Sequence, residues 1–86
     1  NIYTLRFMNT DEQPHTYRVT VGGLESLALA TPAEVSVPPA TTKAVSFALR
    51  ARNDAAGRGS HPVFLEIADV ENEKVRIKEK AVFIMP

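Results

Sequence analysis

The sequence contains no cysteine and no tryptophan. Without cysteine, the chain has no disulfide, no thiolate nucleophile, no iron–sulfur ligand and no cysteine-type zinc site. Long hydrophobic runs are lacking too, because no apolar segment approaches the ~20 residues that a membrane-spanning helix requires. No signal-peptide pattern is visible in these residues, because they open directly on a strand-like pattern. If the protein is exported or anchored in a membrane, we expect the responsible segment to lie outside these 86 residues.

An excess of charge of either sign is also absent. Ten lysines and arginines balance ten aspartates and glutamates, so the formal net charge is zero. Nucleic-acid-binding domains usually carry a basic excess, and anionic membranes attract basic segments, so the charge supports neither partner. The hydrophobic content of 44% is too high for a disordered chain, and a length of 86 residues suits one domain or a piece of one.

Apolar and polar residues alternate with a period of two along most of the chain, which is the pattern of half-buried β-strands. Two short runs, residues 27–29 and 34–37, fit between the longer segments as brief strands. Turn-forming residues separate the segments, among them Gly22-Gly23, Pro38-Pro39 and a hairpin at residues 70–73. No segment has a convincing helical pattern. The sequence therefore predicts an all-β, antiparallel sandwich or small barrel of about seven strands.

The alternation also predicts which side chains enter the core between two packed sheets. They are Tyr3, Leu5, Phe7, Val19, Val21, Val45, Phe47, Leu49, Val63, Leu65, Ile67, Val75, Ile77 and Phe83. In the last long segment the inward row is interrupted at Glu79, before Ala81 and Phe83 resume it. One extra residue in that strand would explain the interruption, so we expect a β-bulge near Glu79.

The two histidines are the first candidates for chemistry. His15 follows a proline in a loop and His61 precedes one at the start of a strand, which is typical of surface or turn histidines. The alternative is a copper site in which a histidine combines with the thioether sulfur of Met8 or Met85. The spacing matches no zinc motif. We therefore predict no metal-binding residue in this domain.

Three further motifs resemble catalytic or anion-binding sites only superficially. Ser60 and His61 are adjacent, and neighbours on a strand point to opposite faces, so they cannot easily act as nucleophile and base. Residues 57–59 (Gly-Arg-Gly) lack the strand–loop–helix context of a phosphate loop and suit a tight turn. Glu66 and Glu79 could pair, but nothing in the sequence fixes their distance. The sequence thus predicts no enzyme, no catalytic residue and no cofactor-binding residue.

A basic row occupies the last long segment, with Lys74, Arg76, Lys78 and Lys80 at alternate positions. This row could bind an anion or a partner. The simpler interpretation is the wet face of a strand, where exposed lysines discourage pairing with other strands. We favour the simpler interpretation, because nearby glutamates dilute the positive field.

Four motifs, in order along nearly the whole chain, resemble a known family. Residues 1–9 read Asn-Ile-Tyr-Thr-Leu-Arg-Phe-Met-Asn, and residues 17–24 read Tyr-Arg-Val-Thr-Val-Gly-Gly-Leu. A Gly-Ser-His-Pro turn at residues 59–62 and a closing Glu-Lys-Ala-Val-Phe-Ile-Met-Pro at residues 79–86 complete the set. Together they are similar to the C-terminal immunoglobulin-like domain of the FixG family, also named RdxA or CcoG.

The resemblance implies that residues 1–86 form one immunoglobulin-like antiparallel β-sandwich from the C-terminus of a larger membrane protein. FixG-like proteins sit in the bacterial inner membrane and carry a ferredoxin-like portion with two four-iron four-sulfur clusters. They are associated with maturation of cbb-type cytochrome c oxidase, with copper handling and with nitrogen-fixation operons. The immunoglobulin-like part is expected on the periplasmic side. This chain has none of the cluster cysteines, so the resemblance implies no cofactor within the domain.

Three functions stay open on the sequence. The resemblance favours a non-catalytic accessory domain that contacts oxidase subunits or other assembly factors through its sheet edges and loops. A copper-presenting module is the second hypothesis. The third is an unrelated adhesion, chaperone or carbohydrate-binding sandwich, although most aromatic residues lie in the inward rows and leave few for a sugar platform. Neither nucleic acid nor a small-molecule substrate is expected as a partner.

Overall fold

The computed structural model describes residues 1–72 and 74–86, and in these residues it contains seven strands and no helix. The strands are β1 (Ile2–Asn9), β2 (His15–Gly22), β3 (Ala28–Leu29), β4 (Glu34–Val37), β5 (Thr41–Arg50), β6 (Gly59–Asp69) and β7 (Arg76–Met85). The predicted all-β fold is confirmed, including both brief strands. Nothing in the described part of the chain forms a helix with the length and apolarity needed to cross a bilayer.

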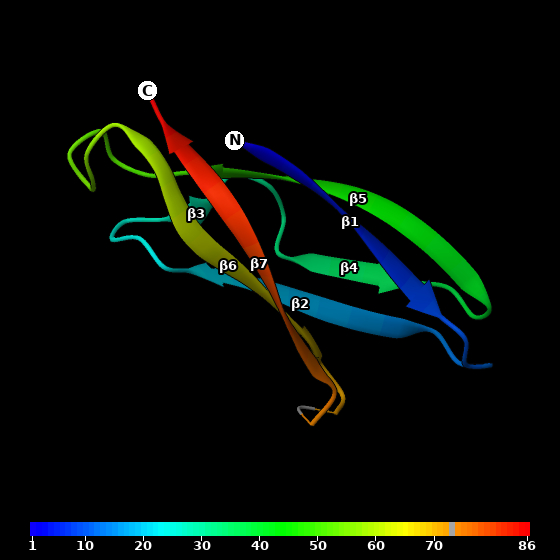
Figure 1. Ribbon diagram of the computed structural model, residues 1–86. Helices are drawn as coiled ribbons and strands as arrows, with labels where there is room; N and C mark the ends of the chain where they lie inside the picture. The colour runs from blue at the N-terminus through cyan, green and yellow to red at the C-terminus, as the bar shows by residue number, and fades with distance from the viewer. Residues whose placement is uncertain (73) are drawn as a thin grey trace.

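The strands form two antiparallel sheets that pack against each other (Figure 1). One sheet has the order β1-β5-β3, and the other has the order β4-β2-β6-β7. Strands β1 and β7 are therefore edge strands of different sheets. Figure 1 shows that the start of β1 and the end of β7 lie near each other, with both termini at the same end of the molecule. The first and last strands thus form one long side of the sandwich.

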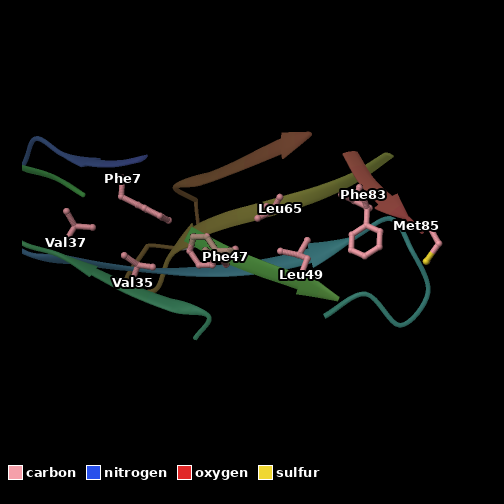
Figure 2. Packing of buried hydrophobic residues seen from close by; sticks show 10 residues of the cluster. Phe7, Val35, Val37, Phe47, Leu49, Leu65, Phe83 and Met85 are labelled. Atoms are coloured by element: carbon pink, nitrogen blue, oxygen red, sulfur yellow. The ribbon is translucent and has the colours of Figure 1, made fainter. Parts of the chain in front are cut away.

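The core lies between the two sheets, where the inward residues of both gather into one cluster (Figure 2). The buried hydrophobic residues are Phe7, Val19, Val35, Val37, Phe47, Leu49, Val63, Leu65, Phe83 and Met85. Seven of them are among the predicted core residues. Five other predicted residues, Tyr3, Leu5, Val21, Val45 and Ile67, are partly buried and pack against the cluster. Most of the inward rows are therefore confirmed.

The prediction is wrong for Val75 and Ile77, whose exposed fractions are 47% and 58%. Ile77 does lie in the inward row of β7, because it pairs with Ile67 of β6. Alternation tells which face of a strand a side chain takes, but it does not tell whether a second sheet covers that face. At this end of β7 the neighbouring sheet gives only partial cover.

The predicted β-bulge near Glu79 is also wrong. The register between β6 and β7 runs without a break from Gly59 opposite Met85 to Ala68 opposite Arg76. Glu79 is simply one member of the odd-numbered row that begins at Ile77, and its carboxylate is exposed. A charged side chain fits this inward row because the row is open to solvent there, so no extra residue is needed.

The hairpin predicted at residues 70–73 connects β6 to β7, although Glu73 lies outside the described residues. Asp69, at the end of β6, is 4% exposed and shapes the turn. Its carboxylate accepts a hydrogen bond from the Glu71 amide at 2.9 Å. The Asp69 amide also donates to the Val75 carbonyl at 3.0 Å. Aspartate is suited to this place because its short side chain satisfies backbone donors two residues ahead.

Candidate interaction surface

The side formed by β1 and β7 is closed at the end that holds both termini. The side-chain amide of Asn1 donates to the Ile84 carbonyl at 3.0 Å, and its oxygen accepts from the Ile84 amide at 2.9 Å. The Tyr3 hydroxyl donates to the Val82 carbonyl at 2.5 Å. Burial raises the pKa of this phenol, which keeps it a neutral donor at physiological pH. These side chains satisfy backbone groups that β7 turns away from β6.

Away from the two termini, β1 and β7 diverge (Figure 1). A groove of about 240 Å³ is lined by residues of both strands. Its apolar lining consists of Leu5, Phe7, Tyr17, Ile67, Val75 and Ile77, and Arg6, Met8 and Glu79 complete it. This volume is below the ~300–1,000 Å³ of typical small-molecule sites. Burial raises the pKa of the Tyr17 phenol, so it stays neutral. The groove is therefore suited to hold apolar side chains of a partner rather than to perform acid–base chemistry.

Exposed apolar side chains are concentrated on the two strands that form this side of the molecule, although they face different ways. Val75 and Ile77 take the inward face at the start of β7, whereas Ile2, Met8, Val82 and Ile84 take the outward faces of β1 and β7. Among the described residues, six of the seven exposed large hydrophobic residues lie on β1, on β7 or directly before β7. They are Ile2, Met8, Val75, Ile77, Val82 and Ile84. Single exposed apolar residues are ordinary on protein surfaces, but their concentration on two adjacent edge strands is typical of an interaction surface. We call the groove and these six residues the β1/β7 edge.

The predicted basic row lies along the β1/β7 edge. Arg76, Lys78 and Lys80 are exposed on the outer face of β7. Arg76 forms an ion pair of 3.1 Å with Glu66 on the neighbouring strand. The ammonium of Lys78 lies 4.0 Å from the centre of the Phe64 ring. The solvent-facing strand that the sequence predicts is confirmed, and cation–π stacking holds one of its lysines over β6.

A polar cluster lies beside Tyr17, where His15 bridges two carboxylates. Its Nδ1 is 2.8 Å from Asp69 and its Nε2 is 2.9 Å from Asp11. The hydrogen bond to Asp11, aided by the bond and charge of Asp69, raises the pKa of His15, although partial burial opposes the shift. The same contact with His15 lowers the pKa of Asp11. This cluster joins the β1–β2 loop to the end of β6.

The copper hypothesis requires His15 or His61 to meet Met8 or Met85. The register of β6 and β7 places His61 diagonally across from Met85, because His61 pairs with Phe83 and Gly59 pairs with Met85. The fold separates the two histidines from each other, so each would meet a thioether without a second imidazole. Both ring nitrogens of His15 already face carboxylates, while His61 lies eight residues away from Asp69 on β6, on the order of 25 Å. Met85 is buried near Asn1, whereas Met8 is exposed at the far end of β1. The described residues include no cluster of three or more potential metal-ligating side chains.

The other motifs with catalytic appearance are also dispersed. Ser60 and His61 are consecutive residues of β6 and therefore point to opposite faces. His61 Nε2 is 2.5 Å from the Gly57 carbonyl. Glu66 pairs with Lys78 and Glu79 with Leu65, so the two glutamates take opposite faces of the sheet. Gly59 has a φ of 109°, which suits the predicted turn. In residues 1–72 and 74–86, the fold thus does not bring the residues of these motifs together.

The sequence profile of one protein family matches residues 1–86, and its description is "IG-like fold at C-terminal of FixG". The chain belongs to this FixG C-terminal family. The same description suggests an oxidoreductase activity for the whole FixG protein. No curated protein sequence matches the chain significantly.

A solved structure agrees with membership of the FixG C-terminal family, and a second one shares the fold. The crystal structure of a FixG-related protein from Vibrio parahaemolyticus has a TM-score of 0.86 and 25% sequence identity, over 98% of this chain and 76% of that one. An extracellular fragment of EsaA from Streptococcus gallolyticus has a TM-score of 0.56 and 19% identity, over 99% of this chain and 23% of that one. The second likeness shows the shared fold alone. The immunoglobulin-like resemblance of the sequence is therefore confirmed.

Sequence reasoning found the basic row of this FixG C-terminal domain but missed the groove beside it. The signal was present, because Val75 and Ile77 continue the apolar row in front of Glu79. A charged residue inside an inward row indicates that this part of the row is open to solvent. Interpreting Glu79 as a break in the strand concealed that indication.

Proposed function

We propose that this chain is a non-catalytic accessory domain of a FixG-type membrane iron–sulfur protein, and that it docks on protein partners through the β1/β7 edge. The observation that carries the proposal is the concentration of exposed apolar residues on β1 and β7. Burial of apolar surface is the main favourable term in protein association, at roughly 25 cal/mol per Å². The match to the FixG C-terminal family supports a FixG protein as the parent.

In this proposal the partners are oxidase subunits or other assembly factors, and the process is maturation of cbb-type cytochrome c oxidase, including copper handling. The domain lies on the periplasmic side of the bacterial inner membrane. The chain has no cysteine and therefore does not fit the parent's iron–sulfur clusters, whose ligands belong to other parts of that protein. Redox chemistry is thus assigned to the parent, and contact with partners to this domain.

The test is co-purification of the full-length parent from membranes. We expect the intact protein to retain its partners and a variant with this domain deleted to lose them. Because deletion can disturb the rest of the parent, a second variant carries Ile77→Asp, which places a charge in the groove of a folded domain. Its matched control is Ala28→Asp, at an exposed position on β3, the opposite edge of the other sheet. If deletion leaves every partner bound, the docking function is refuted.

A further inference from the structure

We propose that the β1/β7 edge binds by strand addition: β7 pairs with an extended segment of a partner protein whose side chains alternate between apolar and acidic. This inference rests on the proposed docking function and specifies the partner's chemistry. Three features of the edge carry it, namely the backbone of β7, the groove beside it and the charge on its outer face.

The backbone of β7 offers free hydrogen-bonding groups along the edge. The Val82 carbonyl and both backbone groups of Ile84 point away from β6, as their hydrogen bonds to the side chains of Tyr3 and Asn1 show. In an antiparallel strand this direction alternates every residue, so the backbone groups of Lys78 and Lys80 point the same way. No strand in residues 1–72 and 74–86 pairs with β7 on that side. The free edge begins where the side chains from β1 stop covering it.

The groove receives one row of the incoming side chains. A strand laid along β7 places every second side chain on the face that Ile77 occupies, directly over the groove. Apolar side chains there would cover Ile77 and Val75, which are exposed to solvent in the structure. Arg6 and Glu79 are the charged residues in the groove lining. Because their charges are opposite, the groove is suited to incoming side chains that carry no net charge.

The other row of incoming side chains meets basic residues. Arg76, Lys78 and Lys80 lie on the outer face of β7, and cross-strand pairs of opposite charge stabilise a sheet. Acidic side chains on the added strand complement this row. A second copy of the chain does not complement this row. Antiparallel pairing of two β7 strands would place the basic row of one copy against the basic row of the other. The charge therefore favours a different protein with acidic residues at alternate positions.

The experiment places a photo-crosslinking amino acid at position 78 of the full-length parent in native membranes. Crosslinked peptides are then identified by mass spectrometry. We expect them to come from another protein and to alternate apolar with acidic residues. Crosslinks to a second copy of the chain, to another segment of the parent, or to a segment without acidic residues would overturn the inference.

Two substitutions at one position separate the backbone contact from the charge. Lys80→Gln removes the charge and keeps the amide, whereas Lys80→Pro also removes the outward N–H without breaking the ladder to β6. We expect the crosslinking yield of Lys80→Pro to be about one fifth of the yield of Lys80→Gln. This is the factor expected for one lost hydrogen bond. Arg50→Gln, at an exposed site on β5 that pairs with β3, is the control with no expected effect. Equal yields for the glutamine and proline variants would overturn strand addition.

These results are distinguishable from failure of the docking function. If domain deletion abolishes co-purification while the proline variant crosslinks normally, the domain docks but does not add a strand. If deletion has no effect on co-purification, both the docking function and the strand-addition inference fall.

Discussion

At the scale of single residues, burial rather than residue type decides what each side chain contributes. Leu65 and Ile77 are both aliphatic and both point to the inner face, yet their exposed fractions are 1% and 58%. Leu65 lies between the sheets, whereas Ile77 lies in the open groove. A core side chain contributes transfer free energy and close packing, and an exposed one contributes little of either.

We therefore expect Leu65→Ala to lower the free energy of unfolding by about 2–5 kcal/mol, because it leaves a cavity in the core. The matched change Ile77→Ala is expected to cost less than about 1 kcal/mol. Urea denaturation of the 86-residue domain measures both values. Similar losses for the two variants would mean that the groove is closed in solution.

The backbone conformation and the close packing at position 23 require glycine. Its φ is 108°, and a Cβ there would lie 2.9 Å from the Val63 Cα. Gly23→Ala is expected to destabilise the domain by about 1–3 kcal/mol, since the strained backbone and the contact with the Val63 backbone add. Gly57→Ala is the control, because nothing lies within 4 Å of a Cβ at that position. Thermal unfolding compares the two, and a Gly23→Ala variant as stable as Gly57→Ala would contradict the described turn.

At the scale of elements, connections between strands depend on a few polar side chains. Asn9, at the end of β1, is 3% exposed and donates to the Gln13, Val37 and Pro38 carbonyls. It also accepts a hydrogen bond from the Asp11 amide at 2.9 Å. In this way Asn9 connects the β1–β2 loop to the end of β4, which belongs to the other sheet. Buried polar groups of this kind are stabilising only when they are fully paired.

The His15 bridge between Asp11 and Asp69 predicts a pH dependence of stability. The pKa of His15 is raised above its ordinary value of 6.5, so its contribution is fully present below pH 6.5 and is lost as pH rises through the folded-state pKa. The pKa of Asp11 is lowered below 3.8, so its contribution is present above pH 3.8 and is lost as pH falls. The bridge is therefore strongest between these two limits.

His15→Gln tests this bridge. The stability lost relative to the native chain is expected to be largest at about pH 5.5 and to shrink by about pH 9, where neutral histidine no longer pairs with two carboxylates. Urea denaturation across this range gives the difference at each pH. A difference that stays constant would show that protonation of His15 has no part in stability.

Strand β7 shows how far a sequence can predict an element and where it cannot. Its inward row was predictable, since alternation alone assigns Ile77, Ala81 and Phe83 to one face. The length of the uncovered stretch was not predictable, because it depends on where the opposing edge strand β1 diverges. The core valines of β4 were missed for a related reason: a run of four residues is too short for its pattern to identify a buried face.

At the scale of the whole molecule, the edge strands β1 and β7 distinguish this domain from a closed sandwich. Edge strands invite unwanted pairing, and exposed lysines discourage it. On β7 the lysines face outward next to an apolar groove, which excludes like-charged strands and permits acidic ones. The family could be recognised from four motifs in the sequence. Glu79 in the inward row indicates that part of this row is open to solvent, but the shape of the groove is not predictable, since it arises from the angle between strands that belong to different sheets.

The central claim is that the β1/β7 edge is the surface through which this domain meets its partner. Amide hydrogen exchange tests it most directly, on the full-length parent purified with its partners and again after high salt has removed them. The account predicts that partner binding slows exchange at residues 76–80 of β7, with smaller effects in residues 2–8 and none in β3 or β4. Protection that appears at β3 and β4 while residues 76–80 exchange equally in both samples would contradict it.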